Sequence, residues 1–226
     1  ENISFTIKAG ERVAIVGYTG AGKTTLLNLL LRFYEISEGR ILIDGKDLKE
    51  FNPRSLRTQT GLVLQDVFLF AGTIEENLTL GTLLPKERIQ QAIQTVGADH
   101  FVSSLPKGLD TLLSERGTSL SVGERQLISF ARALAFDPRI LLLDEATSSV
   151  DRETEKLIQN ALEHLLENRT SLVVAHRLST IQNMDRILVL HHGRIEEMGT
   201  HEELVEKGGL YRDLYKLQFE TSIGKG

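Results

Sequence analysis

The sequence contains no cysteine among its 226 residues. Disulfide bonds, thiolate zinc sites and catalytic thiols are therefore excluded. The lack of cysteine is consistent with a reducing compartment, although cysteine-free proteins also occur elsewhere. The sequence also has no run of about 18 apolar residues, so it predicts no membrane-spanning helix in these residues. The fold must therefore depend on an ordinary hydrophobic core without covalent cross-links.

The composition is that of a globular domain with a slightly acidic charge balance. Hydrophobic residues make up 41% of the chain and charged residues 25%, which excludes disordered, collagen-like and low-complexity proteins. Lys and Arg number 26 and Asp and Glu number 31, so the formal net charge is −5. This balance argues against nucleic-acid phosphates as the main partner. The length fits one soluble domain, or one domain with an inserted subdomain.

Hydrophobic periodicity alternates between strand-like and helix-like segments. Strands are expected at residues 3–7, 13–16, 41–45, 61–64, 140–143, 171–175 and 186–190. Helices are expected at residues 24–33, 86–96, 124–135, 153–166 and 210–219. Such alternation predicts an α/β fold with a mainly parallel sheet, whose ligands bind beyond the carboxyl ends of the strands.

We expect a single domain over residues 1–226 that consists of three parts. Residues 1–65 would hold a small antiparallel β region and the first part of the core. Residues 66–136 would form a mostly helical insert, because they contain helical patterns and no clear buried strand. Residues 137–226 would continue the core and end in helices.

A glycine-rich segment lies between the first expected core strand and the helix that follows it. It is Gly17-Tyr18-Thr19-Gly20-Ala21-Gly22-Lys23-Thr24, which matches the phosphate-loop pattern G-x-x-x-x-G-K-[ST]. Glycines let backbone N–H groups surround phosphate oxygens, and the helix adds its positive N-terminal end. Lys23 would then reach the β- and γ-phosphates, and the Thr24 hydroxyl would bind Mg²⁺. The alternative, a glycine-rich turn that only caps a helix, is disfavoured by the strand–loop–helix context.

Two acidic residues, Asp144 and Glu145, follow the apolar segment at 140–143. Phosphate-loop enzymes place a carboxylate at such a strand end, beside the metal. We expect Asp144 to orient Mg²⁺ through water and Glu145 to polarise the attacking water. Taken alone, the pair could also be a solvated strand end, and the phosphate loop makes that alternative the weaker one.

Four further segments resemble the motifs of ATP-binding cassette (ABC) ATPases. The segment Leu120-Ser121-Val122-Gly123-Glu124-Arg125-Gln126 resembles the signature, and Thr147-Ser148-Ser149-Val150-Asp151 resembles the D-loop. Ala175-His176-Arg177 resembles the switch-histidine segment, and Gln65 lies where the Q-loop glutamine falls. Residues 72–77 and 114–117 resemble segments of the exporter branch. Over nearly its whole length, the chain is thus similar to the nucleotide-binding domain of an ABC exporter.

The resemblance implies a P-loop NTPase core and an enzyme that hydrolyses ATP with the help of Mg²⁺. It assigns ATP binding to Gly17, Tyr18, Thr19, Gly20, Ala21, Gly22, Lys23, Thr24 and Thr25. It assigns Mg²⁺ binding to Thr24, Gln65 and Asp144, and catalysis to Glu145, His176, Gln65 and Lys23. Taken alone, a single histidine such as His176 is more often structural, and its place in the motif order reverses that preference.

The resemblance also implies partners, because two such domains dimerise head to tail around ATP. The signature residues that would bind the partner's ATP are Leu120, Ser121, Val122, Gly123 and Glu124, and the D-loop residues are Ser149 and Asp151. The second nucleotide-binding domain would make a homodimer or a heterodimer. Transmembrane domains, expected in the same polypeptide, would use the ATPase as an export motor at the cytoplasmic face of the inner membrane. Nucleic acid is not an expected partner.

Two features depart from the family pattern. The commonest signature is Leu-Ser-Gly-Gly-Gln, whereas Val122 and Glu124 replace a glycine and a glutamine in this sequence. A β-branched Val122 would crowd a phosphate and Glu124 adds negative charge, so we expect a weaker composite site. Family members stack adenine on an aromatic residue further upstream than this chain reaches before Gly17, so we expect that residue to precede Glu1.

Two other functions remain open from the sequence. ATP could only hold two chains together in a regulatory module, or an ATPase of this class could act on DNA or ribosomes. Glu145 and His176 argue against the first for the site on this chain's own phosphate loop, whereas Val122 and Glu124 leave it open for the opposite site. The acidic balance and the exporter-like segments argue against the second.

The pair His191-His192, which precedes Gly193, predicts an exposed turn between two strands rather than a metal site. Tyr18, at a variable position of the phosphate loop, is expected to face solvent or a neighbouring domain.

Overall fold

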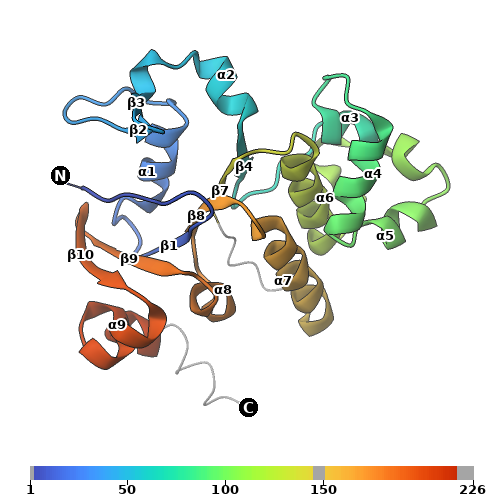
Figure 1. Ribbon diagram of the computed structural model, residues 1–226. Helices are drawn as coiled ribbons and strands as arrows, with labels where there is room; N and C mark the ends of the chain where they lie inside the picture. The colour runs from blue at the N-terminus through green and yellow to red at the C-terminus, as the bar shows by residue number, and fades with distance from the viewer. Residues whose placement is uncertain (1–2, 145–150, 218–226) are drawn as a thin grey trace. The chain divides into compact units, whose positions relative to one another are not determined.

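The structure is a computed structural model that describes residues 3–144 and 151–217 (Figure 1). The chain divides into two compact units. The first combines Glu1–Thr60, Ile140–Glu145 and Arg169–Gly226, and the second combines Gly61–Arg139 and Ala146–Asn168. Neither unit is a continuous segment, because the chain passes between them more than once.

A mainly parallel sheet forms the centre of the first unit. Its strands are β1 (Arg12–Val16), β7 (Ile140–Asp144), β8 (Thr170–Val174), β9 (Arg186–His191) and β10 (Arg194–Gly199). They lie in the order β10-β9-β1-β8-β7, and all neighbours are parallel except β9 and β10 (Figure 1). This sheet confirms the predicted α/β fold.

β1 lies inside the sheet, with β8 hydrogen-bonded on one side and β9 on the other. Val13, Ala14 and Ile15 have no exposed surface, as expected for an apolar strand buried on both faces. The register aligns three strand ends, since Ile15 pairs with Val174 and Val174 pairs with Asp144. The phosphate loop after β1 and the segment after β8 therefore leave the sheet at the same end at which Asp144, the last residue of β7, lies.

Short helices and a small hairpin complete the first unit. The helices are α1 (Lys23–Leu30), α2 (Pro53–Thr58), α8 (Leu178–Gln182), α9 (His201–Lys207) and α10 (Leu210–Tyr215), with the 3₁₀ turn η1 (Leu48–Glu50). The hairpin pairs β2 (Leu42–Ile43) with β3 (Lys46–Asp47) in antiparallel fashion. It is the small antiparallel region that was predicted near the N-terminus.

The strand expected at residues 3–7 does not form, because these residues pair with no neighbouring strand. Its exposure still alternates, with Ile3, Phe5 and Ile7 half-buried between exposed neighbours. The carbonyl of Thr6 accepts a hydrogen bond from the side chain of Arg186. An arginine therefore supplies a donor that a neighbouring strand would otherwise provide.

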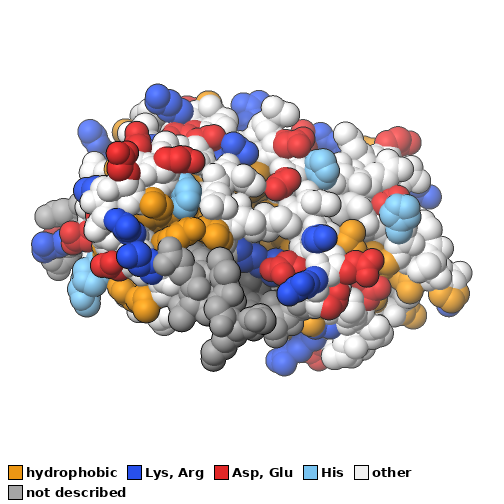
Figure 2. Space-filling model, turned by 90° about the horizontal axis from the view of Figure 1, so that it is seen from below, with side chains coloured by type: hydrophobic (Ala, Val, Ile, Leu, Met, Phe, Trp, Pro, Cys, Tyr) orange, Lys and Arg blue, Asp and Glu red, His pale blue; other side chains and the backbone are white. Residues whose placement is uncertain are grey.

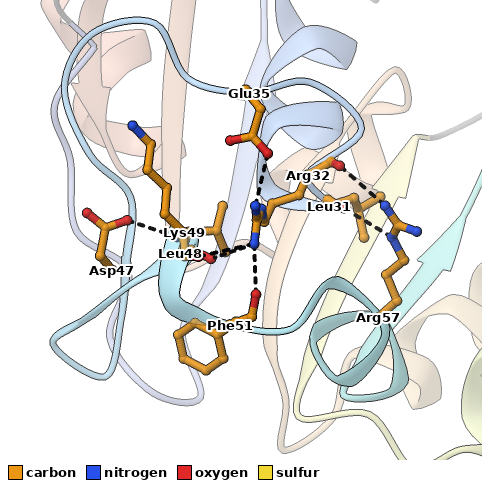
Figure 3. A network of polar contacts seen from close by, with 8 residues as sticks. All are labelled: Leu31, Arg32, Glu35, Asp47, Leu48, Lys49, Phe51 and Arg57. Carbon is orange, nitrogen blue, oxygen red and sulfur yellow. Dashed lines mark hydrogen bonds and ion pairs between the residues drawn. The ribbon is translucent and has the colours of Figure 1, made fainter.

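Arg32 connects the C-terminal end of α1 to the segment after the hairpin (Figure 3). Its backbone has a left-handed φ of 52°. Its Nη1 donates to the carbonyl of Phe51 at 2.7 Å and lies 3.4 Å from the carbonyls of Leu48 and Lys49. Its Nη2 forms an ion pair with Glu35 at 2.9 Å. One guanidinium thus binds three carbonyls between the 3₁₀ turn and Phe51.

Arg57 of α2 acts on the same end of α1 (Figure 3). It donates to the carbonyls of Leu31 and Arg32, each at 3.2 Å, and its guanidinium lies 5.0 Å from the ring of Phe33. The last carbonyls of a helix have no intrahelical donors. The two arginines therefore hold in place the helix whose other end follows the phosphate loop.

The second unit is mostly helical. Its helices are α3 (Ile74–Thr79), α4 (Lys86–Thr95), α5 (Asp99–Ser104), α6 (Val122–Ala135) and α7 (Arg152–Leu166), with 3₁₀ turns η2 (Gly108–Asp110) and η3 (Glu115–Gly117). β5 (Gly72–Thr73) and β6 (Leu112–Leu113) form a short antiparallel pair, and β4 (Thr60–Val63) runs into this unit from the first.

Arg132 of α6 ties that helix to the segment before and within α3. It donates to the carbonyls of Phe68 at 2.9 Å and Asn77 at 2.8 Å, and to Oδ1 of Asn77 at 2.9 Å. Burial lowers the pKa of Arg132 to about 10, so it remains charged at neutral pH. Asn77 in turn donates to the carbonyls of Phe70 and Thr73. The amide and the guanidinium together fix the 68–77 segment.

Acidic and basic side chains are interspersed on the face drawn in Figure 2, with small groups of hydrophobic side chains between them. Some large apolar side chains are exposed, among them Phe68 and Phe70 of the second unit and Tyr34 of the first. Within residues 3–144 and 151–217, no helix has both the length and the apolar character needed to cross a membrane.

Candidate functional site

The loop between β1 and α1 has the backbone of an anion-binding nest. Gly17, Gly20 and Gly22 have φ values of 154°, 83° and 99°, which glycine adopts without strain. A Cβ at Gly17 would lie 2.2 Å from the carbonyl oxygen of Leu190, whereas Cβ atoms at Gly20 and Gly22 would meet open space. The first glycine thus allows a close approach to β9, and the other two leave room for a ligand.

The N-terminal end of α1 is open to an anion. The helix begins at Lys23, and its N-cap is Gly22, which provides no side-chain hydrogen bond. Its first turn contains no acidic residue. The first N–H groups of a helix need acceptors from outside it, and a phosphate oxygen is such an acceptor.

The ammonium group of Lys23 is held inside this loop. Nζ donates to the carbonyl of Gly17 at 2.8 Å and to that of Tyr18 at 3.1 Å. Lys23 is only 8% exposed. Burial lowers its pKa, and the charge of Asp144 opposes that shift. A buried ammonium held by carbonyl dipoles is a ready partner for phosphate.

Thr24 and Asp144 meet at the aligned strand ends. The Thr24 hydroxyl donates to Oδ2 of Asp144 at 2.9 Å, and Asp144 is only 6% exposed. Hydroxyl and carboxylate oxygens are ligands that Mg²⁺ takes, alongside water and phosphate. The donor set therefore fits the magnesium site that the sequence predicts.

His176 lies beyond the end of β8 and belongs to the same electrostatic group. Burial lowers its pKa, the charge of Lys23 lowers it further, and Asp144 acts in the opposite direction. The imidazole is therefore neutral at neutral pH. The structure thus brings together Lys23, Thr24, Asp144 and His176, which are far apart in the sequence.

The remaining predicted residues lie either outside the described residues or in the second unit. Glu145 and Ser149 lie outside the described residues, so their assigned roles stay predictions. Gln65 belongs to the second unit, where it is exposed. The signature and Asp151 also belong to the second unit.

The signature forms the beginning of α6. Ser121 is the N-cap residue, and it shares a reciprocal capping box with Glu124. The backbone N–H of Ser121 donates to the Glu124 carboxylate at 2.7 Å, and the N–H of Glu124 donates to Ser121 Oγ at 3.2 Å. Leu120 is buried at 7% exposure, and Val122 is 41% exposed. The carboxylate of Glu124 is thus engaged by the helix end itself.

Gly123 has a structural role that the sequence did not reveal. A Cβ there would lie 2.3 Å from Cγ2 of Thr154 on α7. The Thr154 hydroxyl donates to Oδ2 of Asp151 at 2.6 Å, and its N–H donates to Oδ1 at 2.9 Å. These hydrogen bonds hold the pKa of Asp151 below its usual value. Asp151 is the N-cap of α7, and Thr154, which it caps, packs against the signature glycine.

The sequence also did not indicate that His191 contacts Tyr18 of the phosphate loop. His191 ends β9 and His192 lies in the turn between β9 and β10, as predicted, and the ring centroid of His191 lies 6.3 Å from that of Tyr18. Tyr18 is 42% exposed, which agrees with its expected position at the surface. No pattern within either segment indicates this contact, because it depends on the pairing of β1 with β9.

Comparison with known proteins identifies relatives that agree with the predicted ABC family. Residues 1–148 match the family model described as ABC transporter. The "Uncharacterized ABC transporter ATP-binding protein YknV" of Bacillus subtilis is 53% identical over 222 residues, which cover 98% of this chain and 37% of that protein. An "ATP-dependent lipid A-core flippase" of Hahella chejuensis is 51% identical over 224 residues, which cover 98% of this chain and 38% of the flippase.

A solved structure supports the same relationship. The "Structure of a bacterial Atm1-family ABC exporter with ATP bound" is similar with a TM-score of 0.88 and 44% sequence identity. The similarity covers 96% of this chain and 38% of the exporter chain. This chain therefore spans well under half the length of these relatives.

The packing at Gly123 predicts the effect of a single methyl group. Gly123→Ala should lower the free energy of unfolding by about 1–3 kcal/mol through overpacking, although alanine is intrinsically the better helix residue by about 1 kcal/mol. Thr154→Ser removes the methyl that the new side chain would meet and keeps the hydroxyl that bonds to Asp151. The double variant should therefore recover most of the loss in urea unfolding. A Gly123→Ala protein as stable as the wild type would contradict the packing account.

Proposed function

Because the chain belongs to the ABC transporter family, we propose that it is the ATP-hydrolysing motor domain of an exporter. In this proposal residues 1–226 form one domain that dimerises around MgATP and drives a substrate across a membrane. The family match confirms the ABC-type ATP-binding domain that the motifs predict. The observation that carries the motor function is the grouping of Lys23, Thr24, Asp144 and His176 at one edge of the sheet.

Phosphate binding follows from the loop and the helix end. Backbone N–H groups of residues 17–22 and of the first turn of α1 would donate to phosphate oxygens. The Lys23 ammonium, already held at the loop, would neutralise charge on the β- and γ-phosphates. Bound Mg²⁺, held by Thr24, Asp144 and Gln65, would polarise the phosphate oxygens for attack.

Hydrolysis needs a positioned water and a donor at the γ-phosphate. Glu145 would accept the proton of the attacking water as general base. The neutral imidazole of His176 would donate a hydrogen bond to a γ-phosphate oxygen and stabilise the transition state. Gln65 would contact the metal and the water. Catalysis of this kind depends on position and charge more than on covalent chemistry.

The signature would bind the ATP of a partner domain, which is a second copy of this chain or a related one. Ser121 Oγ accepts a hydrogen bond from Glu124, so its own hydroxyl proton remains available for a phosphate oxygen. Ser149 and Asp151 would lie at the D-loop contact.

Transmembrane domains would be the second partner, and the inner face of the membrane would be the site of action. The exposed Phe68 and Phe70 rings, whose centroids are 5.1 Å apart, follow Gln65 closely in the chain. An exposed aromatic pair is suited to a protein contact. Names of relatives that refer to a flippase and an exporter support transport as the use of the ATPase.

A regulatory module in which ATP only joins two chains is the main alternative. Glu145→Gln separates the two functions, because it removes the proposed base and keeps a side chain of the same size. We expect the variant to lose steady-state ATP turnover and to accumulate an ATP-bound dimer, as measured by phosphate release and by light scattering after size-exclusion chromatography.

Glu153→Gln is the matched control, because Glu153 is another carboxylate of the chain, at the start of α7, and has no assigned role. It should retain wild-type turnover. Equal and negligible turnover in the wild type and in Glu145→Gln would overturn the motor function. Salt-dependent binding to DNA or RNA would instead favour an ATPase that acts on nucleic acid.

The signature of this chain predicts that removing the charge of Glu124 raises the affinity of the ATP-driven dimer. Gln reproduces the capping box of Glu124 without its charge, so Glu124→Gln should keep α6 intact and remove repulsion of a partner's phosphate. We expect the ATP-driven dimer to tighten by about fivefold, the size of a screened charge–charge term of ~1 kcal/mol. Sedimentation of the proteins in the Glu145→Gln background measures this affinity.

Glu203→Gln provides the control for Glu124→Gln. Thr200 and Glu203 form the same reciprocal capping box at the start of α9, in the other unit. The control should leave the dimer affinity unchanged. A dimer that Glu124→Gln does not tighten would mean that the charge of this signature does not weaken the composite site.

A further inference from the structure

The turn between β9 and β10 is short and conformationally fixed. His191 pairs with Arg194, so His192 and Gly193 are the two residues of the turn. Their φ values are 45° and 73°, both left-handed. Two left-handed residues are typical of the type I′ turn, whose twist matches that of the flanking strands. The turn therefore holds the residues around it at defined positions.

This turn contacts both ends of the phosphate loop. The N–H of Gly193 donates to the carbonyl of Ala21 at 3.2 Å, near the end of the loop. At its beginning, Gly17 approaches the carbonyl of Leu190 so closely that a Cβ would lie 2.2 Å away. Both contacts use backbone atoms of the turn or of the strand that leads into it.

A side-chain contact completes the arrangement. In the parallel pairing of β1 with β9, Val16 is opposite Val189. Tyr18 and His191 each lie two residues further along, and their rings meet edge to face with centroids 6.3 Å apart and planes at 66°. Tyr18 is 42% exposed, so burial alone does not fix its ring. The ring of His191 supplies an orienting contact.

Tyr18 in turn binds the ammonium group of the site, because its backbone carbonyl accepts a hydrogen bond from Lys23 Nζ at 3.1 Å. We infer that His191 is a positioning residue for the phosphate loop and acts through Tyr18. It orients the loop segment whose carbonyls hold Lys23, and so prepares the loop for phosphate before ATP arrives. This inference rests on the proposed function, since it concerns the binding of MgATP at the same loop.

A positioning role of this kind affects binding more than chemistry. His191→Ala should raise the Kd and the KM for MgATP by about 2- to 10-fold, the worth of one aromatic pair, and leave kcat within about twofold. His191→Phe keeps an aromatic edge and should restore wild-type Kd, whereas His191→Leu keeps bulk without a ring and should resemble His191→Ala. Isothermal titration and steady-state kinetics on the purified protein give these constants.

The pair Tyr18 and His191 can be tested as a unit. Tyr18→Ala should raise Kd by the same factor as His191→Ala, and the double variant should be no weaker than either single variant. His100→Ala is the control for loss of a histidine, because His100 is an exposed residue of α5 in the other unit. It should leave Kd and kcat unchanged.

The outcomes separate this inference from the proposed function. A wild-type protein that does not bind MgATP would overturn the proposed function itself. Tight binding by the wild type with equal Kd for Phe, Leu and Ala at position 191 would overturn the inference alone. Multiplicative effects of the two single variants would also overturn it, because His191 would then act without Tyr18. If His191→Ala does not fold, the comparison of His191→Phe with His191→Leu decides the question.

Discussion

The parallel register of β1, β8 and β7 is the constraint on which the rest of the site depends. Because Ile15, Val174 and Asp144 are in register, the phosphate loop, the His176 segment and the Asp144 carboxylate leave the sheet at one edge. The apolar strands hold this edge rigid, since β1 is buried on both faces. One carboxylate, one ammonium and one neutral imidazole then share a partly desolvated space, where the charge of Asp144 acts on the pKa of Lys23 and both charges act on the pKa of His176. A bound phosphate would add negative charge next to the Lys23 ammonium and the neutral His176 imidazole.

The N-terminal ends of the helices differ in which groups accept hydrogen bonds from their first N–H groups. This difference agrees with the role expected of each helix. α1 begins without a side-chain cap, so its N–H groups are open to a ligand. α6 and α7 begin with capping side chains, Ser121 with Glu124 in one and Asp151 in the other. The signature helix therefore has a carboxylate of its own at the end where a partner's phosphate would bind. The packing of Gly123 on Thr154 links this helix end to the cap of α7, so a displacement of one helix end would also displace the other.

The sequence predicted the phosphate loop and the buried strands better than it predicted the packing between elements. The loop at residues 17–24 and the buried strands were predicted, because close backbone approach and burial on both faces leave strong local patterns. The strand at residues 3–7 was wrong, since an alternating pattern fixes which side chains are buried but not whether a neighbouring strand exists. α3 and α8 escaped detection because one or two turns carry too little periodicity. The contact of Tyr18 with His191 and the fit of Gly123 against Thr154 depend on long-range register and on helix crossing, which no local pattern encodes.

The most direct test of the account is the magnesium dependence of ATP binding in Asp144→Asn. Asparagine keeps the size and a hydrogen-bond acceptor for Thr24 but removes the carboxylate that the register places beside it. The account predicts that the wild type binds ATP more tightly with Mg²⁺ than with EDTA, and that the variant loses about 10- to 100-fold of metal affinity. Binding of metal-free ATP should change little, because the loop and Lys23 remain. A variant with the wild-type response to Mg²⁺ would contradict the claim that the aligned strand ends build the metal site.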